Sequence, residues 1–278
     1  MGILLPGETV PVWQKRAIET MVAETDVEIT HLVIHADSTS THLTEFLHDA
    51  SSNEVATYMQ QCYNRLGSHA LWSLLGIVRQ LTETPEYRRP CHIDMITGLD
   101  DAKALYCEPV ADTGFGNHLP DHVTETVGRS TDVVIRFGFG ILTDPILSIP
   151  RHGVLSFHRG DLRSYRGQPG GLWEFLHDEP SAGITLQRID DSLDAGEVIV
   201  EDEVSITDAH TWREVERRQI EACEGMLAVA IDRLQDPDSE PIRVDQLGAL
   251  YTIPRGREVL TYVKKTLLGN LREFVEAG

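Results

Sequence analysis

The stretch TDVVIRF at residues 131–137 is almost continuously apolar and is followed by Gly138. A short strand without polar alternation is typical of the centre of a parallel sheet, where both faces are covered. The next apolar segment, VLSFH at 154–158, follows a loop that contains prolines and glycines. Two such strands in succession predict an open sheet with helices around it, and ligands bind such sheets outside the carboxyl ends of the strands.

The N-terminal segment shows the same order of elements. The apolar residues 3–5 predict a short strand, and residues 27–36 predict a second one. Between them, Thr9 is a candidate cap for a helix that begins near Pro11. About ten residues per element favour parallel strands joined by a helix. We therefore expect an α/β fold with a Rossmann-like, mostly parallel sheet and helices on both faces.

The rest of the chain continues the alternation of strands and helices. Residues 42–83 have apolar residues at helical spacing, which predicts either a core-facing helix or an insertion that contacts substrate or a partner subunit. We expect a catalytic domain over 1–206 that contains this insertion, and a C-terminal helical extension over 207–278 packed on it. The remaining predicted strands are 104–107, 183–189 and 197–206, and the remaining predicted helices are 121–127, 172–176, 211–234 and 257–277, with a small hairpin-like region before the last.

The chain is strongly acidic. Its 278 residues include 44 Asp and Glu against 24 Lys and Arg, only four of which are lysines, and the net charge is −20. Such a surface repels nucleic acid and anionic membranes. It also resembles the surfaces of halophile proteins, which work where ~1 M salt shortens the Debye length to about 3 Å. We favour the halophilic interpretation and keep an ordinary acidic protein as the alternative.

Other sequence features predict where the protein works and what it does not bind. No apolar run approaches the ~20 residues of a membrane span, and the N-terminus has no basic region typical of a signal peptide. The four cysteines form no Cys-x-x-Cys pair, and the 12 histidines form no His-Glu-x-x-His pattern. We therefore expect a cytoplasmic protein with free thiols, no metal and no membrane partner.

The segment from 154 to 199 contains the candidate chemistry. Ser156 and His158 stand two residues apart on one predicted strand, so their side chains share a face about 6.6 Å apart along it. The loop at 159–171 contains glycines that allow a ligand to approach the backbone closely. Asp194 lies in a predicted turn between two strands, from which its carboxylate could return to the same site.

Four motifs in this segment occur in a fixed order: SFH at 156–158, YRGQPG at 165–170, GIT at 183–185 and LDAGE at 193–197. Their order and spacing resemble the catalytic domain of the folate-dependent formyltransferases, which include methionyl-tRNA, glycinamide ribonucleotide and nucleotide-sugar formyltransferases. The stretch VVIRFGFGIL at 133–142 resembles the family strand and loop that hold the folate pterin. The resemblance is specific over about 131–200 and looser over 1–205.

The resemblance implies transfer of a formyl group from 10-formyltetrahydrofolate, as co-substrate, to a primary amine that attacks the formyl carbon directly. His158 would accept the amine proton or stabilise the oxyanion, and Asp194 would orient His158. Ser156 stands where the family has asparagine, and its single hydroxyl is a weaker oxyanion donor than an amide. The implied folate contacts are Arg136, Phe137, Gly138, Phe139 and Ile141, and the implied substrate contacts are Tyr165, Arg166, Gly167 and Pro169.

The two arginines have simpler alternative roles. Arg166 could bind a phosphate or carboxylate of the substrate, or it could brace its loop through an aspartate. Arg136 could form a structural salt bridge instead of contacting the folate.

The sequence leaves alternatives for the acceptor of the formyl group and for the class of activity. The region after Ile206 is mainly helical, whereas methionyl-tRNA formyltransferases carry a C-terminal β-barrel there, so the sequence and its acidity disfavour tRNA as the acceptor. A small-molecule amine, such as an amino sugar on a nucleotide carrier, fits better, and a homodimer is one option for the chain itself. The alternatives are an acyl hydrolase that uses Ser156, His158 and Asp194 as a triad, and a non-catalytic ligand-binding relative.

Overall fold

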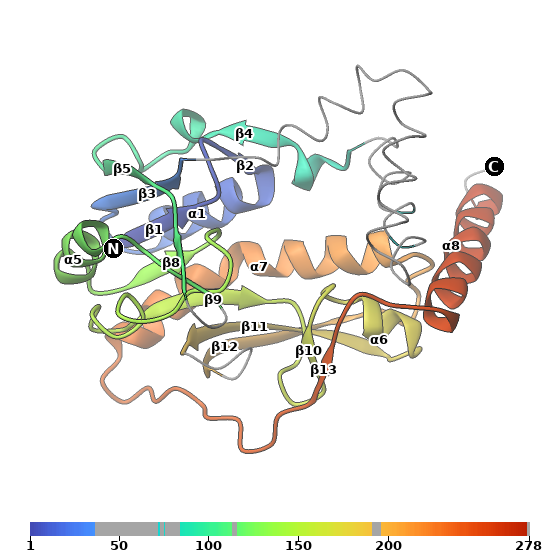
Figure 1. Cartoon of the computed structure of the whole chain (residues 1–278). Coiled ribbons are helices and arrows are strands. Elements are labelled where there is room, and N and C mark those ends of the chain that lie inside the picture. The colour runs from blue at the N-terminus through green and yellow to red at the C-terminus, as the bar shows by residue number, and fades with distance from the viewer. Residues whose placement is uncertain (37–71, 73–74, 76–83, 113–115, 191–195, 277–278) are drawn as a thin grey trace.

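The computed structural model describes residues 1–36, 72, 75, 84–112, 116–190 and 196–276 (Figure 1). At its centre is a seven-stranded sheet in which five neighbouring strands are parallel, and β11 (Ser181–Ile189), next to the edge strand β12 (Glu197–Ser205), pairs antiparallel with the strands on both of its sides. The predicted α/β fold with a mostly parallel sheet is confirmed. In spatial order the strands are β12, β11, β9 (Val154–His158), β8 (Val134–Arg136), β1 (Gly2–Leu5), β3 (His31–His35) and β5 (Lys103–Cys107).

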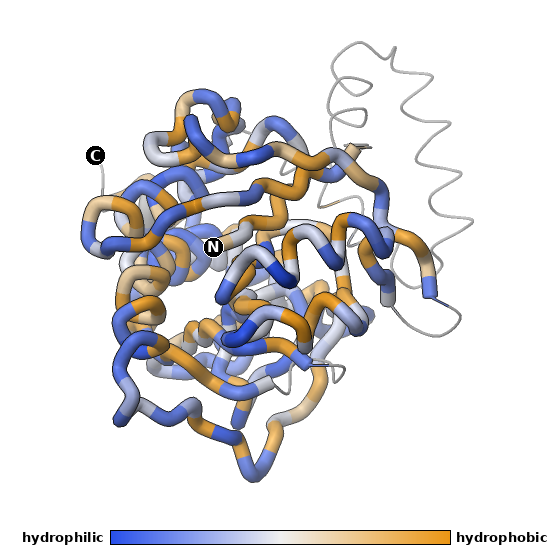
Figure 2. Tube along the Cα trace, turned by 90° about the vertical axis from the view of Figure 1, so that its left-hand side faces the viewer, coloured by the Kyte–Doolittle hydropathy of each residue, from blue (hydrophilic) through white to orange (hydrophobic). Residues whose placement is uncertain are grey.

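Helices cover both faces of this sheet. On one face, α1 (Val12–Glu24) packs against α7 (Trp212–Gln235), and both bury apolar side chains against Ile3 and Leu5 of β1. On the other face, α5 (Asp121–Ser130) places Val123 and Val127 against the central strands. The helical turns in Figure 2 alternate between hydrophobic and hydrophilic colours, as expected for helices with one buried side.

A third apolar cluster joins the elements at the end of the molecule opposite α5 in Figure 1. It contains side chains of α6 (Leu172–Leu176), of the start of α7 and of α8 (Arg257–Glu276), among them Phe175, Trp212 and Tyr262. Of the expected insertion at 42–83, only Trp72 and Leu75 lie within the described residues, and both pack against this cluster. Since α7 also contributes to the central core, the boundary at 206 stays a prediction.

Three two-stranded sheets complete the fold. They pair β2 (Thr9–Pro11) with β4 (Pro90–His92), β6 (Val110–Ala111) with β7 (Asn117–His118), and β10 (Tyr165–Gly167) with β13 (Ala249–Tyr251). The 3-10 turns Glu86–Arg88 and Ile93–Met95 connect to β4. The described helices include none that is long and apolar enough to cross a membrane.

Two local expectations were wrong. Thr9 does not cap α1, because it pairs with β4 as part of β2 and the helix begins only at Val12, after Pro11. The region before α8 forms no hairpin of its own, because β13 pairs in parallel with β10, about 80 residues earlier in the chain. The Gly248 amide, which donates to the Leu162 carbonyl over 2.9 Å, anchors this distant pairing.

Candidate active site

The structure brings three of the candidate residues to one face of the sheet, at the carboxyl ends of β8 and β9. Ser156 and His158 lie on the same side of β9, and the strand register places Arg136 of β8 opposite Ser156. On the other side of β9, Thr185 of β11 lies opposite His158. Ser156 is 2% exposed and His158 is 6% exposed, so their protonation and hydrogen bonding depend on protein groups more than on bulk water.

Arg136 holds the hydroxyl of Ser156. Its Nη2 donates to Ser156 Oγ over 2.9 Å and its Nε donates to the same oxygen over 3.2 Å, while Nη1 donates to the Gly140 carbonyl. A hydroxyl has two lone pairs and one proton, so these two bonds occupy both lone pairs and leave the O–H to donate elsewhere. Arg136 thereby ties the loop after β8 to the strand that carries His158.

His158 is oriented by the loop that follows it. Its Nε2 lies 3.0 Å from the backbone carbonyl oxygen of Tyr165, and since a carbonyl only accepts, Nε2 is the donor. Gly160 allows this approach, because a Cβ at that position would come within 2.8 Å of Nε2. Asp194 lies outside the described residues, so its role beside His158 stays a prediction.

The YRG motif forms β10, next to His158. Arg166 Nε donates to the Gly248 carbonyl over 2.9 Å, so this arginine braces β10 through a backbone oxygen. Gly167 has a φ of 89° and lies against the carbonyl of Tyr251, where a side chain would collide. Pro169 follows directly and precedes α6. Whether these residues contact the substrate stays a prediction.

The expected folate loop is only partly accessible. Phe139 is 4% exposed, Phe137 packs against the main core, and Gly138 lies so close to Pro6 that a Cβ would come within 2.7 Å of its nitrogen. Ile141 is 37% exposed and presents its side chain at the surface. The two phenylalanines therefore support the loop from within, and their direct contact with folate stays a prediction.

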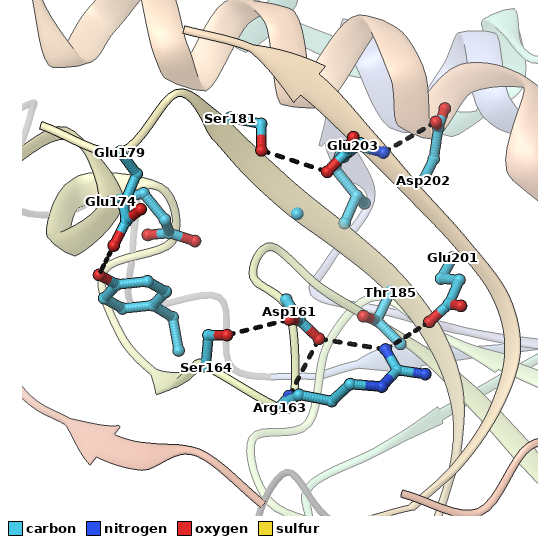
Figure 3. A pocket seen from close by; sticks show the side chains of 13 residues that line it. Asp161, Arg163, Ser164, Glu174, Glu179, Ser181, Thr185, Glu201, Asp202 and Glu203 are labelled. Atoms are coloured by element: carbon cyan, nitrogen blue, oxygen red, sulfur yellow. Dashed lines mark hydrogen bonds and ion pairs between the residues drawn. The ribbon is translucent and has the colours of Figure 1, made fainter.

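A cavity of about 460 Å³ lies beside His158, and the sequence did not indicate it. We call it the acidic pocket (Figure 3). Tyr165 and Thr185 belong both to its wall and to the surroundings of His158. Its lining residues are Asp161, Arg163, Ser164, Tyr165, Glu174, Glu179, Ser181, Gly183, Ile184, Thr185, Glu201, Asp202 and Glu203.

Glu174 is the most deeply buried carboxylate of the acidic pocket. It is 3% exposed, and its Oε1 has no hydrogen-bond partner among the described residues. Burial raises the pKa of Glu174 to about 7, although the nearby His158 favours the charged form. The only sequence signal for this group was a single charge inside the apolar run LWEFL at 172–176.

Glu216 of α7 is the second fully buried glutamate near the site, and it is fully paired. Arg88 and Arg159 both form ion pairs with Oε1, the latter at 2.9 Å, and Tyr87 Oη donates to Oε2 over 3.3 Å. Burial raises the pKa of Glu216, but Arg159 and Arg88 outweigh it and hold the pKa below its usual range. Because Arg159 follows His158 directly, this cluster fixes the start of the loop that follows β9.

A second cavity, of about 410 Å³, lies where β11 ends and β12 begins. Its walls are formed by residues of the segment after β8, by both strands and by Arg243, and none of the five expected folate residues lines it. Glu197 joins the walls, since it accepts hydrogen bonds from Arg188 Nε at 2.9 Å and from Arg243 Nε at 2.7 Å.

Comparison with known proteins identifies the class. Residues 115–231 match the formyl transferase family and include β8, β9, the YRG motif and most of α7. The match over these residues confirms the resemblance found in the motifs.

Particular relatives are similar over shorter stretches. The chain is 31% identical over 121 residues to methionyl-tRNA formyltransferase of Thermotoga neapolitana, covering 43% of this chain and 39% of that protein. It is 39% identical over 85 residues to the enzyme of the same name from Clostridium beijerinckii, covering 30% of this chain and 28% of that protein. The chain thus spans less than half the length of each of these relatives.

Solved structures share the fold. WlaRD, a sugar 3N-formyl transferase, aligns with a TM-score of 0.51 at 12% identity, covering 98% of this chain and 81% of that one. Phosphoribosylglycinamide formyltransferase from Anaplasma phagocytophilum aligns with a TM-score of 0.50 at 16% identity, covering 90% and 98%. At these identities the likeness establishes the fold alone.

Proposed function

We propose that the protein transfers a formyl group from 10-formyltetrahydrofolate to the primary amine of a small molecule. The observation that carries the proposal is the cluster of Arg136, Ser156 and His158 at the carboxyl edge of the sheet, inside the segment that matches the formyl transferase family. This edge is where open α/β sheets bind their ligands. The folate supplies the activated formyl group, and the residues of this chain position the reactants and move protons.

In this proposal His158 handles the proton of the acceptor amine. Its ring is held in one orientation by the bond between Nε2 and the Tyr165 carbonyl and is shielded from water. Since Nε2 already carries a proton, Nδ1 takes the proton that the amine loses, and the protonated ring stabilises the negative oxygen that develops on the formyl group. A positioned acid–base group contributes about 10²–10⁴ in rate. Asp194 orients the ring and favours its protonated form.

Ser156 acts as an oxyanion donor whose direction is set by Arg136. Because the two N–H bonds of Arg136 occupy the oxygen lone pairs, the hydroxyl hydrogen is the only group of Ser156 that can bond a substrate oxygen. The adjacent guanidinium polarises that hydroxyl and makes it a stronger donor. This pair compensates for the amide that the resemblance leads us to expect at position 156.

The same geometry disfavours the acyl hydrolase. A nucleophilic serine needs a base that accepts its proton and a free lone pair for attack. Ser156 Oγ instead accepts two bonds from a guanidinium, which cannot act as a base.

The acceptor is a small amine in this proposal, and an amino sugar carried on a nucleotide is one form of it to be tested. The net charge of −20 disfavours tRNA, because phosphate contacts supply much of nucleic-acid affinity. The homodimer, the cytoplasmic location and the adaptation to salt remain predictions from the sequence.

The experiment combines folate binding with turnover. The purified chain is incubated with 10-formyltetrahydrofolate and a panel of amines, and formylated product is detected by mass spectrometry beside a binding assay by thermal shift. A ligand at ~100 times its dissociation constant adds about 2.7 kcal/mol to the free energy of unfolding. We expect reduced folate to raise the unfolding midpoint, and we expect formylated product with at least one amine.

Three other outcomes would contradict the proposal. An unfolding midpoint that does not change with reduced folate would exclude 10-formyltetrahydrofolate as the formyl donor. Folate binding without transfer to any amine would indicate the non-catalytic relative. Labelling of Ser156 by a serine-directed phosphonate would indicate the hydrolase.

A further inference from the structure

The acidic pocket has an excess of negative charge directly beside the proposed catalytic histidine. Six carboxylates and one arginine line it, and Arg163 pairs with Asp161 at 3.2 Å and with Glu201 at 2.7 Å. Ser181 and Tyr165 engage two more carboxylates as hydrogen-bond donors, to Glu203 Oε2 at 3.1 Å and to Glu179 Oε1 at 2.7 Å. One arginine cannot neutralise this set, so the pocket attracts cations and repels phosphates.

Glu174 is the group that points to a ligand rather than to a solvated acidic surface. It projects from α6 into the cavity in Figure 3, it is 3% exposed, and its Oε1 lacks a hydrogen-bond partner among the described residues. A buried carboxylate oxygen without a donor is costly to fold around. An ammonium group in the cavity would supply both the missing donor and the opposite charge.

The architecture connects this cavity to the site of transfer. The side chains of Thr185, Glu201 and His158 lie on one face of three neighbouring strands, because Thr185 is in register with both other residues. The Tyr165 carbonyl that bonds His158 belongs to a residue of the cavity wall. A ligand in the acidic pocket therefore lies beside the face on which His158 sits.

We propose that the acidic pocket binds a protonated amine of a linear diamine or polyamine, whose other terminal amine is the acceptor at His158. The inference rests on the proposed function and names its substrate class. In the reaction, a bond forms between the acceptor nitrogen and the formyl carbon while the bond from that carbon to the folate nitrogen breaks. The proton lost by the acceptor ends on the folate nitrogen, so no further reactant is needed.

A metal ion fits the pocket less well. Among the residues that the structure describes, no group of three or more histidine, cysteine, aspartate or glutamate side chains is arranged to hold one. A nucleotide carrier also fits poorly, because its phosphates would face carboxylates such as Glu174 and Glu179.

The test measures binding of spermidine without folate, by calorimetry and thermal shift at constant ionic strength. The parent is compared with Glu174→Gln, which keeps the size of the side chain and removes its charge. Glu125→Gln is the matched control, because it removes the same charge from the exposed surface of α5, away from the pocket. We expect the parent and Glu125→Gln to bind alike, and Glu174→Gln to lose at least about tenfold in affinity, the effect of one charge-assisted bond.

Equal binding by the parent and both variants would overturn the inference, because it would mean that spermidine only responds to the net charge of −20. An equal stabilisation by magnesium chloride at matched ionic strength would overturn it as well. Spermidine binding without formyl transfer would contradict the proposed function but support the cation site. Transfer to an amino sugar nucleotide, with no spermidine binding, would remove only the polyamine assignment.

Discussion

Two glutamates near the candidate active site are both almost fully buried but differ in their charge partners. Glu216 on α7 is 0% exposed and holds Arg88 and Arg159, whereas Glu174 on α6 is 3% exposed and leaves Oε1 without a partner among the described residues. The arginines lower the pKa of Glu216 against the effect of burial, while burial raises the pKa of Glu174 to about 7. Burial alone therefore does not fix the charge of a glutamate, and its partners do.

The difference separates a structural group from a ligand-seeking one. Glu216 connects the turn that carries Arg88, the helix α7 and the residue after His158, so its charge is needed for the fold. Glu174 connects nothing through its Oε1 among the described residues and lines an open cavity. Changes at Glu216 should lower stability, whereas changes at Glu174 should alter ligand binding, turnover and the pH dependence of stability.

His158→Ala should give the largest effect on the active-site side. We expect formyl transfer to fall by about 10²–10⁴, because the variant removes the acid–base group. The unfolding midpoint should stay close to that of the parent, since the strand backbone of β9 is unchanged. Single-turnover rates measure the loss of formyl transfer, and calorimetry of the same preparations measures the unfolding midpoint. Full activity in a well-folded variant would remove His158 from the mechanism.

Glu216→Gln should give the largest effect on the structural side. Replacing the buried carboxylate leaves two arginines without their counter-charge, and breaking a buried ion pair costs about 3 kcal/mol. In a chain of this size that lowers the unfolding midpoint by roughly 6–10 °C.

The control for this variant is Glu221→Gln on the same helix. Glu221 forms an exposed pair with Arg217 at 2.7 Å, and such pairs contribute about 0.5 kcal/mol. If both variants lowered the midpoint equally, the Glu216 cluster would not have the structural role assigned to it.

Glu174→Gln should change the pH dependence of stability. The folded state raises the pKa of Glu174 from 4.5 to about 7, so it binds the proton more tightly than the unfolded chain does. The parent should therefore lose stability as the pH rises from about 4.5 through 7, by about 3 kcal/mol in total. The variant should lack this loss and be the more stable protein at pH ~8.

Urea unfolding at about pH 5 and pH 8 measures the difference. The groups that face Glu174 are His158 of β9, Asp161 of the loop after it, Tyr165 of β10 and Glu179 after α6, and they are present in both proteins. Parallel stability curves for parent and variant would show that Glu174 is not the group that titrates.

The sequence predicted the boundaries of individual helices and strands better than it predicted which of them lie side by side. The boundaries of β9 coincide with the predicted strand 154–158, and α6 coincides with 172–176, because short apolar runs end at clear breaks. The contact between Arg136 and Ser156 depends on the register of two parallel strands, which the sequence does not encode locally. The acidic pocket depends on the antiparallel register of β11 and β12 and on the loop that folds over them. The helix at Pro11 was predicted correctly, but its cap was not, because β2 pairs with a strand about 80 residues away.

Ser156→Asn should give the smallest effect. From the sequence alone, restoring the family amide could raise turnover by up to ~10²–10³. The structure reduces that expectation, because Arg136 already directs the Ser156 hydroxyl and the site is only 2% exposed. An asparagine carbonyl can accept the same bonds from Arg136 while its NH₂ replaces the hydroxyl as donor. We expect activity within about tenfold of the parent, the equivalent of one hydrogen bond.

The dependence on Arg136 is the sharper measurement. Arg136→Met in the parent should lower turnover by roughly tenfold or more, since the serine hydroxyl loses both its orientation and its polarising charge. The same change combined with Ser156→Asn should cost less, because an amide donor needs no arginine to direct its hydrogens. A double-mutant cycle on single-turnover rates gives this coupling directly. Additive effects would mean that Arg136 acts independently of position 156, and collapse of Ser156→Asn to background would return Ser156 to the role of a nucleophile.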